Sequence, residues 1–359
     1  MQSRLLISAT AMLLSTLTGC GGERANDEVS LNEGSLKKAL ELITTNTILP
    51  AVGQFSAQTQ ALADNADSFC AAPDSNTLNA VQQQWKNTAD AWYQLLPFNF
   101  GPLDDDLVFP TYQYIDSYRL RGTDYTETVR TNISSWLAGS ETLDETFFAA
   151  QTFQKVGLLA LEVALFETSD THSAAISDIV SEYTDNRRKC AALNGLSDYL
   201  NSKAQAIETA WNTEFADSGS SYEALFLGDA LPDGSAALTT LITAQQEFLD
   251  YLQQRNVVTT ITPLADHAWS MAGKAVDSIE QVIEGNTDAA VSLAGLMQAS
   301  GNQASVDTVR SNLAMARDSI NDVDATSFNS AAALLDGNFK REIPDSLDVN
   351  LGINFTDGD

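Results

Sequence analysis

The sequence contains few of the residues on which nucleic-acid binding and electrostatic membrane docking depend. Lys and Arg together number 19 against 48 Asp and Glu in 359 residues, so the formal net charge is −29. Contact with a nucleic-acid backbone requires clustered basic side chains, and docking on anionic lipid requires a basic face. The charge balance therefore argues against nucleic acid as a partner, and it leaves a covalent lipid as the expected route to a membrane.

Histidine is scarcer still. The two histidines, His172 and His267, lie 95 positions apart. A zinc peptidase of the HExxH type needs two imidazoles one helical turn apart and a glutamate base. The sequence also lacks the GxSxG, Walker A and dinucleotide-binding glycine patterns. These absences disfavour the enzyme classes that such motifs identify.

Proline is also scarce, with eight residues, and runs of alternating β-branched residues are few. Hydrophobic residues instead recur at intervals of three, four and seven, as at Val81, Trp85 and Trp92. This is the spacing of an amphipathic helix, for which Ser75 or Asn76 is the expected N-cap. The sequence therefore predicts an all-α fold class.

Helical patterns occupy two stretches, each long enough for an antiparallel bundle. We expect residues 31–216 to form a first helical bundle and residues 235–359 to form a second one with a C-terminal tail. Residues 217–234 are rich in Ser, Gly and Asp and are the expected linker. The predicted architecture is two antiparallel helical-bundle domains packed together.

The N-terminus carries a targeting signal. Residues 1–19 hold one charge, Arg4, before an apolar stretch too short to span a bilayer. The stretch ends in Leu-Thr-Gly-Cys at Cys20, which resembles a bacterial lipobox; an ordinary secretory signal with a chance cysteine is the alternative. We expect acyl chains on Cys20 to anchor the mature chain, with residues 20–30 as a tether. Gly21 in place of Asp favours the outer membrane, with the body of the protein facing the periplasm.

Two cysteines remain once Cys20 is lipidated, namely Cys70 and Cys190. In an oxidising compartment an even remainder predicts a disulfide. We therefore expect a bridge between Cys70 and Cys190 within the first bundle. A pair of buried free thiols is the alternative.

One acidic residue occupies an unusual position. Between residues 156 and 166, Glu162 is the only polar side chain, and a helix that is apolar on every face is a buried helix. A buried carboxylate must be paired, protonated or bound to a ligand. Two interpretations stay open: a structural hydrogen bond or salt bridge, and a ligand-binding role in which Glu162 is the only metal-ligand candidate.

The expected surroundings of Glu162 follow from its helix. We place it near the face of the first bundle that meets the second, where Gly157 would allow a close helix approach. The expected partners, which with Glu162 are the candidate ligand-binding residues, are Trp85, Trp92, Tyr112 and Arg119, with Arg121 as a further possible ion-pair partner.

The remaining polar features have ordinary structural explanations. Trp85 and Trp92 share a helix face, which favours core packing over stacking on a cofactor. The run Asp104–Asp106 lacks the alternating spacing and the glycine of a calcium loop, so we expect a solvated acidic turn. For His172 and His267, surface or capping roles are favoured over metal binding.

Several short segments follow the lipobox in order and extend over nearly the whole mature chain, from about residue 36 to residue 359. The segments are Ile48-Leu49-Pro50, Phe69-Cys70-Ala71-Ala72-Pro73, Trp85 with Ala91-Trp92, Phe100-Gly101-Pro102-Leu103, Gly157 to Phe166, and Leu351 to Asp359. Together they resemble the imelysin family of helical envelope proteins. The resemblance implies two helical bundles with a site at their junction.

The functions that this resemblance implies are only partly matched by the residues. The family was once classed with metallopeptidases, and some members are linked to iron regulation or ferrous-iron uptake. Its proposed ligand motif is GxHxxE, and the matching stretch keeps Gly157 and Glu162 but has Leu159 at the histidine position. Leucine offers no lone pair to a metal, so the motif's metal site and peptidase activity are disfavoured.

The leading hypothesis is a non-enzymatic, imelysin-like lipoprotein that binds a small ligand or a cation in the periplasm. Iron or another divalent cation is the candidate cofactor, and a role in iron acquisition is implied by the resemblance alone. Two alternatives are a metal-dependent peptidase and a module that binds a partner protein or a polysaccharide without a small-molecule site.

Overall fold

The computed structural model describes residues 33–351, apart from residues 120–121, 232–234 and 287. Every regular element in this part of the chain is a helix, which confirms the predicted all-α class. The predicted signal peptide, lipidation site Cys20 and tether lie outside the described residues, as do Arg121 and most of the C-terminal segment. No helix of residues 33–351 combines the length and the apolar character that a membrane crossing requires.

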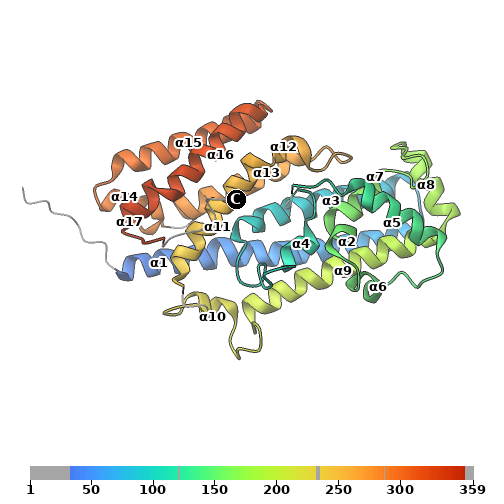
Figure 1. The fold of residues 1–359 in the computed structure, drawn as a ribbon, viewed down its shortest axis with the longest axis horizontal. Coiled ribbons are helices and arrows are strands. Elements are labelled where there is room, and N and C mark those ends of the chain that lie inside the picture. The colour runs from blue at the N-terminus through green and yellow to red at the C-terminus, as the bar shows by residue number, and fades with distance from the viewer. Residues whose placement is uncertain (1–32, 120–121, 232–234, 287, 352–359) are drawn as a thin grey trace, which may run out of the picture.

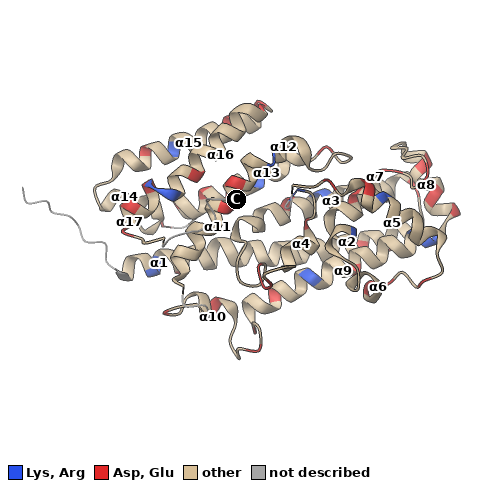
Figure 2. Cartoon of the chain, in the orientation of Figure 1, with Lys and Arg blue, Asp and Glu red and all other residues tan. Residues whose placement is uncertain are grey.

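The helices pack as two groups that lie side by side along the molecule (Figure 1). The first group contains α2 (Leu49–Ala71), α3 (Ser75–Leu95), α4 (Thr111–Ile115), α5 (Thr126–Ala138), α6 (Glu145–Ala149), α7 (Gly157–Phe166), α8 (Ile176–Asp185) and α9 (Arg187–Asn212). The second contains α11 (Ala237–Gln254), α12 (Val257–Thr260), α13 (Ala268–Glu284), α14 (Leu293–Ala299), α15 (Gln303–Asn321), α16 (Ala325–Lys340) and α17 (Glu342–Leu347). Acidic residues are spread over both groups (Figure 2).

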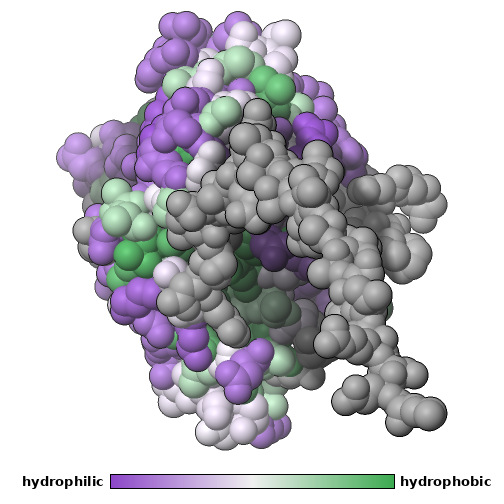
Figure 3. Space-filling view, turned by 90° about the vertical axis from the view of Figure 1, so that its left-hand side faces the viewer, coloured by the Kyte–Doolittle hydropathy of each residue, from purple (hydrophilic) through white to green (hydrophobic). Residues whose placement is uncertain are grey.

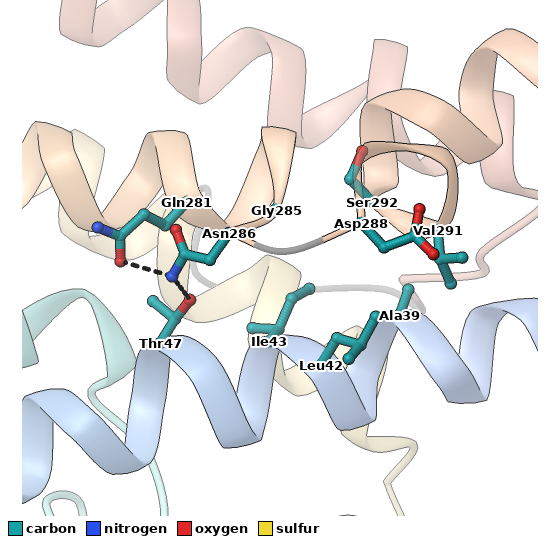
Figure 4. Close-up of a pocket in the computed structure, with 10 residues that line it drawn as sticks. All are labelled: Ala39, Leu42, Ile43, Thr47, Gln281, Gly285, Asn286, Asp288, Val291 and Ser292. Atoms are coloured by element: carbon teal, nitrogen blue, oxygen red, sulfur yellow. Dashed lines mark hydrogen bonds between the residues drawn. The ribbon is translucent and has the colours of Figure 1, made fainter.

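One helical rod connects the two bundles. Helix α1 (Glu33–Ile43) packs against α14, and it continues through the π-helical turn η1 (Thr44–Ile48) into α2 of the first bundle. A π turn disturbs the regular backbone hydrogen bonds. Asn286 donates to the carbonyl of Asn46 at 2.8 Å. It also donates to Thr47 Oγ1 at 3.1 Å (Figure 4). The adjoining cavity of about 10 Å³ lies between α1 with η1 on one side and the segment from Gln281 to Ser292 on the other. It has room for about one water molecule.

Helix α3 begins one or two residues earlier than the sequence indicates. Asp74, rather than Ser75 or Asn76, is the N-cap, and its carboxylate accepts hydrogen bonds from the backbone N–H groups of Asn76 and Thr77 at 2.8 Å each. Thr77 Oγ1 accepts in return from the Asp74 N–H at 3.1 Å, which completes a capping box.

The stretch expected as a linker carries a packed helix, α10 (Tyr222–Phe226). Tyr222 and Phe226 are buried, with ring centroids 4.9 Å and 5.9 Å from that of Trp211, and Phe226 stacks on Phe100 at 5.0 Å. Aromatic contacts of this kind contribute stability beyond their buried area. Part of this segment therefore belongs to the hydrophobic core, a role that its Ser, Gly and Asp content conceals.

The bundles meet along α3 and α13. Ser278 donates to the carbonyl of Gln94 at 2.7 Å, and His267 Nε2 lies 2.8 Å from Asp90 Oδ1. Ser270 donates to the other oxygen of Asp90 at 3.0 Å.

The end of the molecule near α14 and α17 shows a mixture of hydrophilic and hydrophobic residues at its surface (Figure 3).

Candidate functional site

Helix α7 supplies the central residue of the candidate site. All of its residues except Phe166 are buried, as its uniformly apolar sequence predicts. Its first residue, Gly157, has φ +80°, and a Cβ there would lie 2.4 Å from the carbonyl oxygen of Ile115 and 2.6 Å from that of Tyr114. Glycine is therefore required by the backbone and by the close approach. The approach is to α4 within the first bundle, and not to the face that meets the second bundle as the sequence suggests.

Glu162 links the two bundles. Its side chain is fully enclosed, and Oε2 accepts a hydrogen bond from Tyr118 Oη at 2.7 Å. Oε1 accepts from two backbone N–H groups of the second bundle, at 3.0 Å from Leu264 and 2.8 Å from Ala265. The prediction that Glu162 lies near the face meeting the second bundle is confirmed.

Burial dominates the ionisation of Glu162. Loss of solvent raises the pKa of its carboxyl group to about 7, although the hydrogen bonds from Tyr118 and the two backbone N–H groups act to lower it. The charge of Glu167 adds a smaller upward contribution. Glu162 therefore changes its protonation state near neutral pH.

A second enclosed carboxylate, Asp116, lies directly after α4. Its Oδ2 accepts from the indole N–H of Trp92 at 3.1 Å, and its Oδ1 accepts from the backbone N–H of Tyr118 at 3.1 Å. The hydroxyl group of Tyr93 also acts to lower the pKa of this carboxyl group. Burial raises the pKa of Asp116 to about 6 against these lowering hydrogen bonds.

These groups form one polar network, which we call the junction cluster: the buried residues Tyr93, Asp116, Tyr118 and Glu162, and the half-buried Tyr251. Tyr93 on α3 and Tyr251 on α11 have hydroxyl oxygens 3.2 Å apart, so the cluster reaches the second bundle at this point as well. Burial is the main cause that raises the pKa of each of the three tyrosines well above 10, so each keeps its proton.

The residues expected around Glu162 have other contacts. The Trp85 indole donates to the carbonyl of Leu158 at 3.1 Å, Trp92 donates to Asp116, and Arg119 forms an ion pair with Asp124 at 3.4 Å. Tyr112 is half-buried against the hydrophobic core. The expectation of these partners is therefore corrected to Tyr118 and two backbone N–H groups, whereas the core placement of both tryptophans, each fully buried, is confirmed.

The donor set does not fit a metal ion. Across the described residues no three His, Cys, Asp or Glu side chains gather closely enough to hold one. Leu159, at the motif's histidine position, is a core residue with 1% exposure. Both oxygens of Glu162 already accept hydrogen bonds. The arrangement suits a hydrogen-bonded carboxyl group between two bundles better than a metal ligand.

The remaining cysteines are neighbours. Cys70 at the end of α2 and Cys190 at the start of α9 are both buried and are free thiols in the structure. The Cys190 thiol donates to the backbone carbonyl of Cys70 at 3.9 Å, and the interaction between the two thiol groups raises the pKa of Cys70 and lowers that of Cys190. The fold thus brings together the two residues that the sequence pairs, and the disulfide itself stays a prediction.

Two helical bundles joined through the enclosed carboxyl group of Glu162, with a second enclosed carboxyl group, Asp116, nearby in the first bundle, define a class of helical proteins whose junction is polar. The chain belongs to the imelysin family, because the family model for imelysin matches residues 48–345.

Two solved structures share the fold. An imelysin-like protein from Psychrobacter arcticum 273-4 superposes with a TM-score of 0.70 at 16% identity, covering 89% of this chain and 98% of that one. A "putative iron-regulated protein A precursor" from Parabacteroides distasonis ATCC 8503 gives a TM-score of 0.61 at 17% identity, covering 88% and 96%. No curated protein sequence matches the chain significantly.

Proposed function

We propose that this chain is a non-enzymatic binding protein of the bacterial cell envelope, anchored to the outer membrane through lipid on Cys20, and that it recognises another protein. In this proposal the junction cluster fixes the orientation of the two bundles and does not bind a ligand. The lipobox at Cys20 supports the location, and the absence of the motif histidine at Leu159 supports the lack of peptidase chemistry.

The observation that carries this proposal is the enclosure of Glu162. The side chain has 0% exposure, and both of its oxygens accept hydrogen bonds, from three donors in all. Two of those donors are backbone N–H groups of the other bundle, so a ligand at Glu162 would have to displace contacts that hold the bundles together. A buried carboxyl group with a hydrogen bond to each oxygen acts as a specific structural connection.

A second candidate function is cation binding in iron handling. It is supported by the name of the Parabacteroides distasonis relative and by a net charge of −29, which would concentrate cations near the surface. Because Glu162 is the only metal-ligand candidate that the sequence offers, this function requires that substitution of Glu162 abolish cation binding.

One set of measurements separates these functions. We expect Cys20→Ala to abolish membrane association of the expressed chain. After anaerobic dialysis against Fe²⁺, we expect the wild type and Glu162→Gln to bind the same amount of iron. We also expect no peptide hydrolysis that a chelator inhibits. Membrane association that survives Cys20→Ala would overturn the location. Stoichiometric Fe²⁺ that Glu162→Gln abolishes would establish the cation site instead, and chelator-sensitive hydrolysis would establish the peptidase.

A further inference from the structure

The loop that follows η2 (Leu96–Phe98) exposes three consecutive apolar side chains. Leu107 is fully exposed, at 104% of its reference area, and Val108 and Phe109 are exposed at 56% and 49%. In the described residues only two other large apolar side chains are comparably exposed, Val323 and Leu334, and they are isolated from each other in sequence. Single exposed apolar residues are common, but a contiguous group indicates a binding surface.

We propose that residues 104–110 form a docking loop for a partner protein that offers an apolar pocket with a basic rim. This inference rests on the proposed binding function and names the surface that performs it. Leu107 would enter the pocket, Val108 and Phe109 would cover its edge, and the adjoining aspartates would face the rim.

The aspartates hold the loop in its shape. Asp106 Oδ1 accepts hydrogen bonds from the backbone N–H groups of Val108 and Phe109 at 2.8 Å each. Asp105 accepts from Thr111 twice, at 2.8 Å from the backbone N–H and 3.0 Å from the hydroxyl. The three aspartates are exposed, as expected of a solvated acidic turn, and the hydrogen bonds of Asp105 and Asp106 brace the turn on which the apolar residues are exposed.

The base of the loop is fixed as well. Tyr112 donates its backbone N–H to the carbonyl of Leu103 at 3.0 Å, which closes the loop. The ring of Phe109 lies 6.2 Å from that of Phe153, a buried residue of the first bundle. A loop that is ordered before binding loses less conformational entropy on association, which favours its use in recognition.

Charge indicates the chemistry of the partner. Asp104, Asp105 and Asp106 are exposed, and Glu247 on α11 is close enough for the charge of Asp104 to add to the effect of burial in raising the pKa of Glu247. Within the described residues none of these four carboxylates takes part in an ion pair. An apolar tip within an acidic surround matches an apolar pocket rimmed by Lys and Arg.

The same negative charge disfavours a membrane or a second copy of this chain as the binding partner of the loop. A membrane would have to accept three aspartates beside the apolar tip, and charged side chains enter a bilayer at high cost. A second copy of this chain would bring an equally acidic surface against the first, and like charges brought together at an interface lower affinity.

Photocrosslinking tests the docking loop in intact cells. p-Benzoylphenylalanine replaces Leu107 in the full-length chain, and in a matched control it replaces Val323, an exposed apolar residue on the second bundle. We expect irradiation to give one discrete heteromeric adduct from position 107 and none from position 323. The crosslinked protein is then identified by mass spectrometry, purified and titrated with the uncrosslinked chain.

Surface variants then test the chemistry of the contact. We expect Leu107→Asp to weaken binding of the purified partner by about tenfold or more, as for a central interface residue, and Val323→Asp to leave it unchanged. Because Asp104 and Glu247 do not hold the loop, Asp104→Asn with Glu247→Gln should reduce the salt dependence of binding. Circular dichroism of each variant checks that the fold is intact.

Each other outcome overturns the inference. An adduct with phospholipid, with a second copy or with another part of the same chain would assign the loop to a different occupant, and no adduct would remove the docking role. A partner whose affinity ignores Leu107→Asp would show that crosslinking reported proximity alone. These failures leave the tests on Cys20 and Glu162 unaffected, so the loop and the proposed function can be rejected separately.

Discussion

Glu162 shows how a costly residue is accommodated. Taking a carboxylate out of water is unfavourable unless hydrogen bonds compensate for the lost solvation. Here three donors converge on the side chain, and burial raises its pKa to about 7. With a pKa of about 7, Glu162 is a neutral acid below neutral pH and a carboxylate above it.

Substitutions at Glu162 should distinguish hydrogen bonding from charge. Glutamine keeps a carbonyl oxygen for the N–H groups of Leu264 and Ala265, so we expect Glu162→Gln to change the free energy of unfolding by less than about 1 kcal/mol. Glu162→Leu leaves three buried donors without an acceptor and should cost about 1–3 kcal/mol. Urea unfolding at pH 6 measures both; equal costs for the two variants would contradict the hydrogen-bonding role.

The raised pKa values predict a stability that falls as pH rises. A group whose pKa is higher in the folded state contributes stability that is complete below its unfolded pKa and is lost through its folded pKa. For Glu162 this window extends from about 4.5 to about 7, and for Asp116 from 3.8 to about 6. We expect the unfolding free energy of the wild type to decline across pH 5–7.5 more steeply than that of Glu162→Gln.

The difference between the two proteins is the informative quantity, because the many other carboxylates titrate equally in both. Parallel pH profiles for the wild type and Glu162→Gln would show that Glu162 titrates normally.

At the scale of the element, α7 depends on the way it begins. An alanine at position 157 would need a positive φ and would place its Cβ 2.4 Å from the carbonyl oxygen of Ile115. We expect Gly157→Ala to destabilise the protein by about 3 kcal/mol or more, since a backbone clash adds to the conformational cost.

Gly219 provides the matched control. It has φ +71° with nothing within 4 Å of its added Cβ, so Gly219→Ala isolates the conformational cost, about 1 kcal/mol. Thermal unfolding of both variants gives the comparison. A Gly157→Ala protein no less stable than Gly219→Ala would show that the close approach to α4 is dispensable.

At the scale of the whole molecule, a disulfide between Cys70 and Cys190 would link distant parts of the sequence. The two residues are 120 positions apart in sequence and adjacent in the fold. In the chain-entropy model a disulfide closing such a loop stabilises by about 4–5 kcal/mol. We expect thiol counting on denatured, unreduced mature protein to find neither cysteine free, and reduction to lower the denaturant midpoint. Two reactive thiols would refute the bridge.

Much of the fold was predictable because its signals are local. Helical spacing gave the all-α class, and the uniformly apolar run around Glu162 gave a buried helix near the second bundle. The N-cap of α3 and the packing of residues 222–226 were not predicted, because both depend on contacts of individual side chains and not on apolar spacing. Asp74 became the N-cap because its side chain meets Thr77 in a capping box, and α10 packs through Tyr222 and Phe226 although its neighbours are typical of a loop.

The partners of Glu162 were not predictable in the same way. Tyr118 follows α4 in a short loop without periodicity, and backbone N–H groups such as those of Leu264 and Ala265 leave no mark in a sequence at all. A search among charged and aromatic side chains could therefore name Trp92 and Arg119 as readily as Tyr118, and it could not name backbone N–H groups at all.

The sequence by itself determined which residues must be buried, which ones form helices and where an unusual carboxyl group lies, because apolar periodicity and the cost of buried charge act within one element. Only the tertiary structure decided what compensates that carboxyl group, that Cys70 meets Cys190, and that Leu107 is presented by aspartates turned toward their own backbone. Each of these depends on groups brought together across the fold, and no local pattern specifies such a meeting.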